Sequence, residues 1–272
     1  MADQQVVATP FKVGDIIKQS YTLTREVGAG AYGAIFEARY QGSQGTKNVA
    51  LKFEKEDMDR PLLLNEVMVM KAMAGNKHYA KFYQYGSHKD YKFVAMELLG
   101  PCLIDLVNRK PPFKFTLFSV LKFGLHGLKG LEAMHEAGFV HRDVKPGNFV
   151  IGNTKESAGV FFVIDFGLCK KLPPKDKRNV IPPHNGNFRG TLRYASLNAH
   201  YCRELGQADD LMSLLYIMVE FYMGKLPWTH VKTREEVQTV KEQCIGERLV
   251  AHMPHLFLDF EMHIQKLQYF DE

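Results

Sequence analysis

The stretch FVHRDVKPGNFVIG, residues 139–152, places three polar side chains between two apolar runs. These are Asp143, Lys145 and Asn148, and the short apolar runs on either side of them are typical of buried strands. A carboxylate, an ammonium group and an amide beside a buried framework are expected either in a solvated turn or in a site that handles phosphate and a metal ion. The sequence on both sides of the stretch helps to decide between these alternatives.

A second acidic residue follows at the end of another apolar run. Residues 160–164 (VFFVI) predict a short buried strand that forms a hairpin with residues 149–151, and Asp165 comes directly after it. Asp143 and Asp165 therefore flank one hairpin, with Asn148 beside them. One acid and the amide supply oxygen ligands of the kind that Mg²⁺ takes together with substrate phosphates, which leaves the other acid free to orient a hydroxyl nucleophile. The nearby lysine of the opening stretch is within reach of a transferred phosphoryl group.

Residues 21–40 (YTLTREVGAGAYGAIFEARY) alternate apolar and polar residues around a glycine cluster, which predicts a hairpin. Gly28, Gly30 and Gly33 form a G-x-G-x-x-G pattern, and glycines let backbone amides approach phosphates closely. The pattern alone is a weak signal, since short glycine patterns also arise by chance. A dinucleotide-binding fold would place a helix directly after it. The residues after Gly33 predict a strand instead, which favours a flap over phosphates.

A lysine and a glutamate farther along the chain are expected to form an ion pair. Residues 48–54 (NVALKFE) predict a strand that carries Lys52, and a lysine on an edge strand is common. The next segment predicts a helix that begins near Pro61, ends before Gly75 and carries Glu66 in an apolar run. A carboxylate there is costly unless it is paired, so Lys52 is its expected partner. Such a pair could hold the lysine against the phosphates of a nucleotide.

The second part of the chain is richer in helix patterns. Residues 92–101 (KFVAMELLGP) predict a strand that ends at a Gly-Pro break, and residues 116–138 predict a long helix that ends at Gly138. The chain therefore predicts an α+β fold with a lobe boundary near Gly100. The expected parts are an N-terminal extension, a small antiparallel β-sheet lobe with one helix, and a mainly helical lobe, over residues 1–20, 21–99 and 100–272.

Composition limits the class of protein. The 272 residues are 46% hydrophobic and 24% charged, which is ordinary for a soluble globular protein. No apolar run is long enough to cross a bilayer, and the N-terminus lacks the pattern of a signal peptide. The four cysteines have no metal-ligand spacing and are interpreted as reduced thiols. We therefore expect a protein of the cytoplasm, with the nucleus as a second compartment and no membrane partner.

Positive charge is concentrated in one segment. Residues 170–193 contain seven lysines or arginines and one acid, Asp176, so the net charge of this segment is +6. The net charge of the whole chain is +5, so the remaining residues sum to about −1. Such a patch predicts an anionic partner or, with about equal weight from charge alone, a solvated loop. The segment has few aromatic residues and no nucleic-acid motif, so nucleic acid is not an expected partner.

These motifs together resemble the signature of eukaryotic protein kinases. His-Arg-Asp-x-Lys-x-x-Asn at 141–148 precedes Asp-Phe-Gly at 165–167, and the glycine pattern, Lys52 and Glu66 come before them in the family's order. Five fixed positions in so short a span recur by chance only on the order of once in ten thousand chains. The resemblance implies a two-lobed protein kinase fold that uses ATP and Mg²⁺.

Other segments resemble one branch of that family. Ser-Leu-Asn at 196–198 stands where most kinases have Ala-Pro-Glu and is similar to the Ser-Ile-Asn of the casein kinase I superfamily, as is MELLGP at 96–101. The stretch GNFRGTLRYASLNAH (186–200), with Pro182-Pro183 upstream, is most similar to the tau-tubulin kinase branch. The resemblance extends from about Tyr21 to Phe270, nearly the whole chain.

The resemblance also implies roles in nucleotide binding. The loop over the phosphates would contain Val27, Gly28, Ala29, Gly30, Gly33 and Ile35. Lys52 would contact the α- and β-phosphates while paired with Glu66. Ala50 would pack on the adenine, Met96 would be the gatekeeper, and residues 97–99, including Glu97 and Leu99, would form the hinge whose backbone bonds the adenine edge.

The same resemblance implies the catalytic set. Asp143 would be the base or would orient the hydroxyl, Lys145 would stabilise the γ-phosphate, and Asn148 with Asp165 would hold Mg²⁺. Thr191 would bond the catalytic loop, and the helix acid Asp210 would support it. A pseudokinase or scaffold is the alternative, but such proteins commonly lose the lysine, the base or the metal aspartate, and all of these are present here.

Substrates are expected to be proteins phosphorylated on Ser or Thr. Arg193 occupies the position that binds anions in casein kinase I relatives, with Lys232 expected nearby, so acidic or already phosphorylated sites are favoured. A cytoskeletal partner such as tubulin or tau is an analogy with the branch name. Two departures from the family are apolar, Met212 and Leu215 in a buried helix. The chain stops at LQYFDE, whereas relatives continue for another helix or two, so either the helical lobe is short or the sequence is a fragment.

Overall fold

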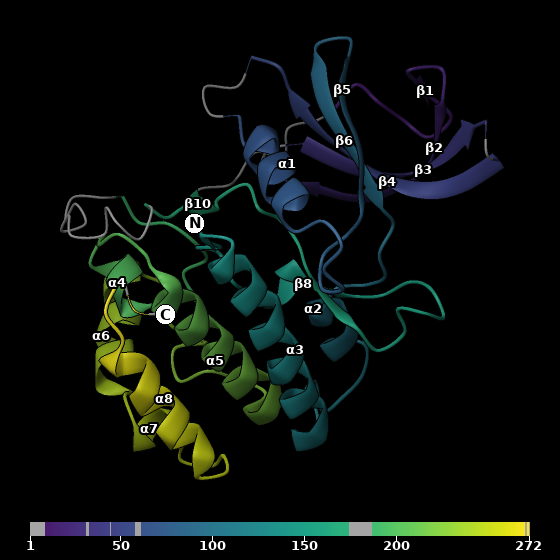
Figure 1. Ribbon diagram of the computed structural model, residues 1–272. Helices are drawn as coiled ribbons and strands as arrows, with labels where there is room; N and C mark the ends of the chain where they lie inside the picture. The colour runs from purple at the N-terminus through teal and green to yellow at the C-terminus, as the bar shows by residue number, and fades with distance from the viewer. Residues whose placement is uncertain are drawn as a thin grey trace.

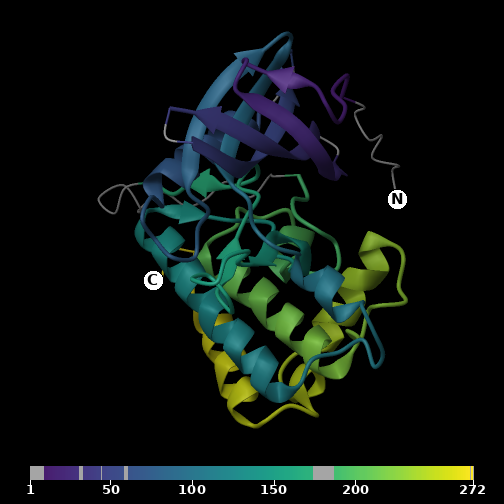
Figure 2. The same ribbon diagram turned by 90° about the vertical axis from the view of Figure 1, so that its right-hand side faces the viewer.

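An antiparallel sheet and a group of helices form two lobes in the computed structural model of the chain (Figure 1). The structure describes residues 9–30, 33–43, 45–57, 61–173, 187–269 and 271. A view turned by 90° shows the sheet above the helices, with a narrow connection between the two parts (Figure 2). The predicted α+β fold with a small antiparallel sheet lobe and a mainly helical lobe is therefore confirmed.

The sheet of the upper lobe has six antiparallel strands in the order β1-β2-β3-β4-β6-β5. Its strands are β1 (Ile16–Ile17), β2 (Tyr21–Gly30), β3 (Gly33–Gly42), β4 (Gly45–Lys55), β5 (Phe82–His88) and β6 (Tyr91–Glu97). Buried and less buried residues alternate along most of β3, as expected for a strand with one face on a core. That core includes the rings of Phe36, Phe53 and Phe93, and Phe11 from the expected N-terminal extension packs against Phe53 in it.

Helix α1 (Leu63–Ala72) belongs to the sheet lobe and begins close to the predicted position. The buried carboxylate of Glu54, at the end of β4, accepts hydrogen bonds from the backbone amides of Leu62 and Leu63. These amides have no acceptor within the helix, so Glu54 satisfies the start of α1 from outside it. One end of the helix is thereby fixed to the strand that carries Lys52.

The lower lobe consists mainly of helices. They are α2 (Leu103–Val107), α3 (Leu117–Glu136), α4 (Leu197–His200), α5 (Gln207–Met223), α6 (Arg234–Gln243), α7 (Glu247–Val250) and α8 (Leu256–Lys266). Helices α3 and α5 lie side by side in its centre (Figure 1). They approach closely at Gly127, where an added Cβ would lie 2.8 Å from a methyl carbon of Leu214. Of the two departures in α5, Leu215 is fully buried and Met212 packs partly buried against the same core.

Short strands carry the polar residues of the opening sequence stretch. β8 (Phe149–Ile151) pairs with β9 (Phe161–Val163), which confirms the predicted hairpin, and β7 (Phe139–Val140) pairs with β10 (Lys170–Lys171). A single 3₁₀ turn, Pro146–Asn148, leads into β8. The apolar side chains of this framework pack on α3, so the polar residues at its edge are held in place from below.

One predicted boundary is wrong. The strand expected over residues 92–101 ends at Glu97, before the Gly-Pro break. The backbone leaves the sheet there because it bonds to the lower lobe instead: the amide of Gly100 donates to the carbonyl of Ile151, and the amide of Ile151 donates to Pro101. Residues 98–101 therefore connect the two lobes.

Two expectations from composition concern the cysteines and membrane-spanning segments. All four cysteines are free thiols. Within the ranges described above, no helix has the length and apolar character needed to cross a membrane. Most of the basic segment, including Pro182-Pro183, lies at residues 174–186, outside the described residues.

Candidate active site

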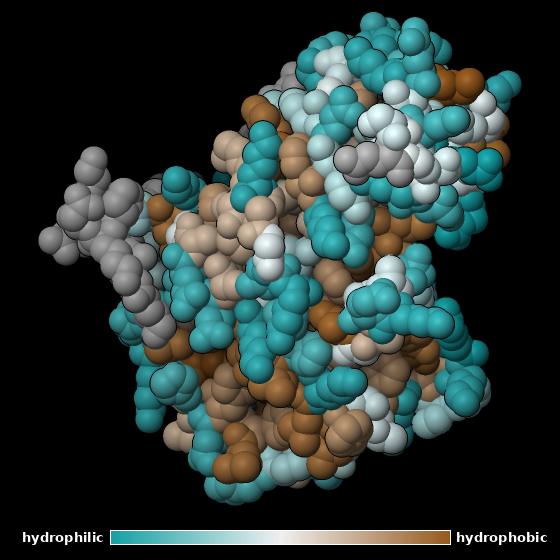
Figure 3. Space-filling view, turned by 45° about the vertical axis from the view of Figure 1, so that its right-hand side comes forward, coloured by the Kyte–Doolittle hydropathy of each residue, from teal (hydrophilic) through white to brown (hydrophobic). Residues whose placement is uncertain are grey.

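A cavity of about 320 Å³ lies between the sheet and the helical lobe. Apolar atoms are visible where the outline of the molecule narrows between the lobes (Figure 3). Residues of β2, β3 and β4 line it from above, and residues of the 3₁₀ turn Pro146–Asn148 and of β8 line it from below. The predicted nucleotide residues that it brings together are Val27, Gly28, Gly33, Ile35, Ala50, Lys52, Glu66, Met96, Glu97, Leu99, Asn148 and Asp165.

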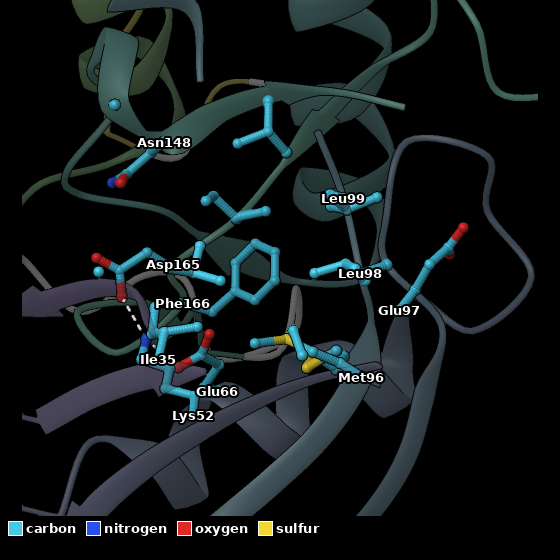
Figure 4. Close-up of a pocket in the computed structure, with 18 of the residues that line it drawn as sticks. Ile35, Lys52, Glu66, Met96, Glu97, Leu98, Leu99, Asn148, Asp165 and Phe166 are labelled. Atoms are coloured by element: carbon cyan, nitrogen blue, oxygen red, sulfur yellow. Dashed lines mark hydrogen bonds and ion pairs between the residues drawn. The ribbon is translucent and has the colours of Figure 1, made fainter. Parts of the chain in front are cut away.

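One end of the cavity is charged. The ammonium group of Lys52, on β4, lies 2.6 Å from Glu66 Oε2 on α1 and 3.0 Å from Asp165 Oδ1 (Figure 4). The ion pair predicted between Lys52 and Glu66 is therefore confirmed, and Asp165 is a second carboxylate partner. These three residues come from both lobes, so the pairs join β4, α1 and the segment after β9 around one cation.

Electrostatics differ among these three groups. Burial alone would lower the pKa of Lys52, but its two carboxylate neighbours raise that pKa above the ordinary value. Lys52 lowers the pKa of Asp165 below its ordinary value, so this carboxylate stays ionised. The pKa of Glu66 is raised, because its burial outweighs the nearby ammonium group. The end of the cavity thus holds a stable cation beside an ionised acid.

The glycine pattern lies on the hairpin of β2 and β3. At Gly33 the backbone has φ of +152°, and an added Cβ would lie 1.8 Å from the carbonyl oxygen of Phe53 on β4. Only glycine fits there, because any side chain would enter the neighbouring strand. The backbones of Ala29 and Gly30 complete β2, paired with Ala34 and Gly33. The tip of the hairpin, residues 31–32, lies outside the described residues.

The other end of the cavity is apolar. Met96, near the end of β6, lines this end, and Leu98 and Leu99 follow in the segment between the lobes (Figure 4). The side chain of Glu97 turns away from the cavity, and its carboxylate accepts the backbone amide hydrogen of Lys81. Glu97 therefore contributes backbone to the cavity, and its role in a hinge stays a prediction.

The polar residues of the opening stretch converge below the cavity. Asp143 is buried, and its two carboxylate oxygens accept hydrogen bonds from Thr191 Oγ1 at 2.7 Å and Lys145 Nζ at 2.5 Å. The amide nitrogen of Asn148 donates to the backbone carbonyl of Asp143 at 2.8 Å. The expected contact of Thr191 with the catalytic loop is thus present, although 48 residues separate it from Asp143.

Asp210, near the start of α5, fixes the loop that precedes Asp143. Its buried carboxylate accepts hydrogen bonds from the backbone amides of His141 and Arg142 and from the ring Nε2 of His135. Burial would raise the pKa of Asp210, but these hydrogen bonds hold it below the ordinary value. Arg142 has a left-handed φ of 67°, and this strained backbone persists because Asp210 holds both amides.

Asp165 is held in an unusual conformation at the end of β9. Its φ is 65°, which is uncommon for a residue other than glycine. The backbone that follows is fixed by Asn65 of α1, whose amide nitrogen lies 3.0, 3.1 and 2.8 Å from the carbonyl oxygens of Phe166, Gly167 and Cys169. α1 therefore holds this segment twice, through Glu66 and Lys52 and through Asn65.

The residues proposed for Mg²⁺ fit a hard cation by their chemistry. Asn148 and Asp165 line the same cavity. Because the Asn148 nitrogen donates to the carbonyl of Asp143, its amide oxygen is free to coordinate a cation. Asp165 likewise has a second carboxylate oxygen that Lys52 does not contact. No cluster of three or more His, Cys, Asp or Glu suited to a metal occurs among the described residues. Two oxygen ligands completed by phosphate and water are usual for Mg²⁺.

The two residues expected to bind a substrate anion lie in separate segments, before α4 and before α6. The side chain of Arg193 is 42% exposed, but its guanidinium group lies 2.9 Å from Oε1 of Glu220 on α5. Lys232 is exposed in the segment before α6. Arg142, directly before Asp143, bonds the backbone carbonyl of Leu168 and the carboxylate of Glu204.

Sequence reasoning missed part of the site. The cavity is also lined by Met70, Ala80, Gly100, Gly147, Val150, Ile164 and Phe166. Met70, Val150 and Ile164 are apolar residues in predicted strands or a predicted helix, and hydrophobic pattern alone cannot separate a cavity wall from a core. Asn65 was not predicted to belong to the site; its position as a polar residue in an apolar helix was a signal, since a buried amide needs hydrogen-bond partners.

Comparisons with known proteins agree with this geometry. The family model described as protein kinase domain matches residues 21–267. A probable serine/threonine-protein kinase of Dictyostelium discoideum is 36% identical over 261 residues, which cover 96% of this chain and 52% of that protein. The chain thus spans about half the length of this curated relative. The matched range and the identity place the chain in the protein kinase domain family, to which it belongs.

Proposed function

We propose that the chain is the catalytic domain of a serine/threonine protein kinase, which transfers the γ-phosphate of ATP to hydroxyl groups of protein substrates. The observation that carries this proposal is the Lys52 ammonium group between Glu66 and Asp165, at the charged end of a cavity whose other end is apolar. A charged end suits a triphosphate and an apolar end suits a purine. The kinase relative supports the same reaction.

Adenine is proposed to lie at the apolar end, against Ala50 and Met96, with the backbone of residues 97–99 bonding its edge. The glycine hairpin of Val27, Gly28, Ala29, Gly30, Gly33 and Ile35 would cover the phosphates, and Lys52 would contact the α- and β-phosphates. Mg²⁺, held by Asn148 and Asp165, would neutralise charge on the phosphates. Lys52 needs no proton exchange for this role, because its carboxylate neighbours keep it charged.

Asp143 is proposed to orient the substrate hydroxyl and accept its proton. Thr191 and Lys145 hold its two oxygens, so the carboxylate has a fixed direction before substrate binds. Lys145 would move to, or share its charge with, the transferred γ-phosphate. The chemistry is mainly positioning and neutralisation of charge.

The test of this proposal is transfer of labelled phosphate from ATP with Mg²⁺ to casein by the wild type and by Asp143→Asn, followed by phosphoamino-acid analysis. Label on Ser or Thr with the wild type only supports the proposal. No transfer above the variant, from protein shown to be folded, contradicts it and favours a nucleotide-binding or scaffolding role. Label on Tyr alone would reject the Ser/Thr assignment.

Membership of the casein kinase I superfamily, in the tau-tubulin kinase branch, is a finer proposal. It is supported by the Ser-Leu-Asn motif, because Ser196 and Asn198 both hydrogen-bond Asp209 near the start of α5, at 2.6 and 3.0 Å. The motif thus has a structural role of its own that an Ala-Pro-Glu sequence would not reproduce. We propose acidic or already phosphorylated sites as substrates, with Arg193 and Lys232 as the cations that favour them.

Peptides of one sequence test the substrate preference. The same Ser-containing peptide would be offered with a neutral residue, an acidic residue or a phosphoserine at one neighbouring position. A lower KM for the acidic and phosphorylated forms, reduced in Arg193→Gln, supports the proposal. Equal KM values for the three forms contradict it.

A further inference from the structure

Lys241, on α6, is a buried cation without an acidic partner. The residue is 1% exposed. No carboxylate lies within ion-pair distance of its ammonium group in the described parts of the chain. Buried lysines are rare and normally pair with a carboxylate, because removing an ammonium group from water is costly. The contacts that Lys241 makes instead indicate what it does.

The ammonium group of Lys241 bonds neutral acceptors. Its Nζ lies 2.9 Å from the backbone oxygen of Leu192, 2.6 Å from that of Ala195 and 3.2 Å from Nε2 of His200. Three acceptors match the three donors of an ammonium group. The rings of Tyr216 and Trp228 lie 5.2 and 5.0 Å from Nζ, measured to the centroids, and add cation–π attraction.

Two of these acceptors belong to one short segment, Leu192–Ala195. A third carbonyl of the segment, that of Arg193, accepts a hydrogen bond of 2.7 Å from Trp228 Nε1. Side chains of α6 and of the segment after α5 thus hold three of its four carbonyl groups from below. Directly before the segment lies Thr191, which bonds Asp143, and directly after it lies Ser196, the N-cap of α4.

We propose that Lys241 is a positioning residue for the protein substrate, because it fixes the Leu192–Ala195 segment beside the hydroxyl-orienting Asp143. This inference rests on the proposed kinase function and assigns part of it to a residue far from the cavity. The segment carries Arg193, the cation proposed to favour acidic substrates. A change at Lys241 should therefore alter the binding of the protein substrate and leave the nucleotide site unaffected.

The charge state of Lys241 is sensitive to pH near neutrality. Burial lowers its pKa to about 7. The groups that face it are His200 from α4, whose pKa burial lowers to about 4, and Tyr216 from α5, whose pKa burial raises. Arg234 and Glu242 act on His200 from α6. His200 is therefore neutral and accepts at Nε2, and above about pH 7 the uncharged amine loses one of its three donors.

The experiment compares the wild type with Lys241→Met, Lys241→Gln and Lys225→Met. Lys225 is an exposed lysine after α5, so its substitution matches the loss of charge without touching the segment. Lys241→Gln keeps an amide N–H donor, and it replaces Lys241→Met as the test variant if the methionine variant does not fold. Each protein is assayed for peptide phosphorylation at pH 6.5 and 8, for ATP hydrolysis without peptide, and for hydrogen exchange of residues 190–200.

The expected result is a peptide KM raised about fivefold or more in the Lys241 variants, as expected for lost binding interactions. ATP hydrolysis should stay within about twofold of the wild type, and faster exchange should be confined to residues 190–200. The wild type should lose peptide affinity between pH 6.5 and 8, and the Lys241 variants should not. Lys225→Met should behave as the wild type.

Three outcomes overturn the inference. An unchanged peptide KM in a folded Lys241 variant removes the substrate role. Faster exchange throughout the chain, with ATP hydrolysis and peptide transfer reduced equally, shows general destabilisation instead of positioning. Failure of the wild type to phosphorylate any peptide rejects the proposed kinase function and the substrate role with it.

Discussion

Two lysines that point into the protein have opposite surroundings. Lys52 lies between two carboxylates, from Glu66 and Asp165, and its pKa is raised. Lys241 lies among two backbone carbonyls and a neutral histidine, and burial lowers its pKa to about 7. Both ammonium groups have hydrogen-bond partners, so the presence of hydrogen bonds does not explain why their pKa values shift in opposite directions. The formal charge of the partners explains it, because only Lys52 has carboxylate partners.

The difference shows what each kind of partner can do. A carboxylate offsets the loss of hydration with a full negative charge, so the pKa of Lys52 is raised and the side chain stays protonated near neutral pH. Carbonyl oxygens are dipoles, which satisfy the geometry of an ammonium group but offset less of its desolvation. Lys52 is therefore suited to a constant task such as contact with phosphates, and Lys241 to holding a segment of backbone.

The largest expected effect comes from removing the better-paired lysine. In Lys52→Met, phosphate transfer should fall roughly a hundredfold or more, because the cation beside the phosphates is lost. The free energy of unfolding should fall by about 3–5 kcal/mol, because Glu66 remains buried without a counter-ion. Single-turnover transfer and urea unfolding measure the two effects.

A surface ion pair provides the control for that stability effect. Arg25 pairs with Glu37 at 3.0 Å, and its side chain is 66% exposed. Arg25→Ala should lower the free energy of unfolding by less than about 1 kcal/mol and leave transfer unchanged. Equal losses of stability in the two variants would mean that the Lys52 pair is worth no more than an exposed one.

The second prediction concerns stability against pH. The folded pKa of Lys241 is about 7 and its ordinary value is 10.5, so between these values the unfolded chain binds more protons. Stability contributed by Lys241 should therefore rise as pH increases from about 7 toward 10.5, by at most about 1.4 kcal/mol per pH unit. Urea unfolding of the wild type and Lys241→Met across this range measures the difference.

The pH dependence of stability that comes from Lys52 should have the opposite sign to that from Lys241. Its folded pKa is raised, so its contribution is fully present below pH 10.5 and is lost only as pH rises through the folded pKa. Titration of Lys52 itself should thus leave the difference between wild type and Lys52→Met unchanged from pH 7 to 9, while titration of Lys241 changes the difference for Lys241→Met. A constant difference for both lysines would contradict the lowered pKa of Lys241.

The third prediction concerns the support of the charged end of the cavity. Asn65→Ala removes the amide that contacts three carbonyls after Asp165. Transfer should fall by about three- to tenfold, and the free energy of unfolding by about 1–3 kcal/mol, because buried carbonyls lose their donor. Leu64→Ala, on the same helix at a side chain that is 48% exposed, is the control and should change transfer by less than about twofold.

Equal transfer by Asn65→Ala and Leu64→Ala would show that the Lys52 pairs alone hold the segment. Transfer kinetics with saturating peptide and varied ATP separate the two effects. A loss in kcat indicates misplacement of Asp165, whereas a loss confined to the KM for ATP indicates a weaker nucleotide site.

The sequence predicted much of the charged end of the cavity. Lys52 and Glu66 lie 14 residues apart, and one isolated carboxylate in an apolar helix was enough to predict their pairing. The hairpin that ends at Asp165 was likewise visible in two short apolar runs. These features are local, or they follow from the cost of burying one unpaired charge.

The surroundings of Lys241 could not be predicted in this way. Its acceptors are backbone carbonyls 46 and 49 residues earlier in the chain, and every residue has such a carbonyl. Asp210 and the two amides it holds are similarly 68 and 69 residues apart, and that contact was expected only from the family resemblance. Residue type predicts a contact when the partner is chemically distinctive, and backbone acceptors are not.

The smallest expected effect comes from giving Lys241 the kind of partner that Lys52 has. His200 is buried, its Nε2 bonds Lys241, and its Nδ1 has no partner among the described residues. Glutamate is close to histidine in reach, and the positive charges of Lys241 and Arg234, which act on position 200, would favour its ionised form.

In His200→Glu the pKa of Lys241 should therefore rise toward its ordinary value. Transfer at pH 6.5 should change by less than about twofold, because the segment is still held, whereas the rise of stability above pH 7 should disappear. His200→Gln, which keeps a neutral acceptor, should retain that rise. If both variants retain it, the charge of the partner does not explain the contrast between the two lysines.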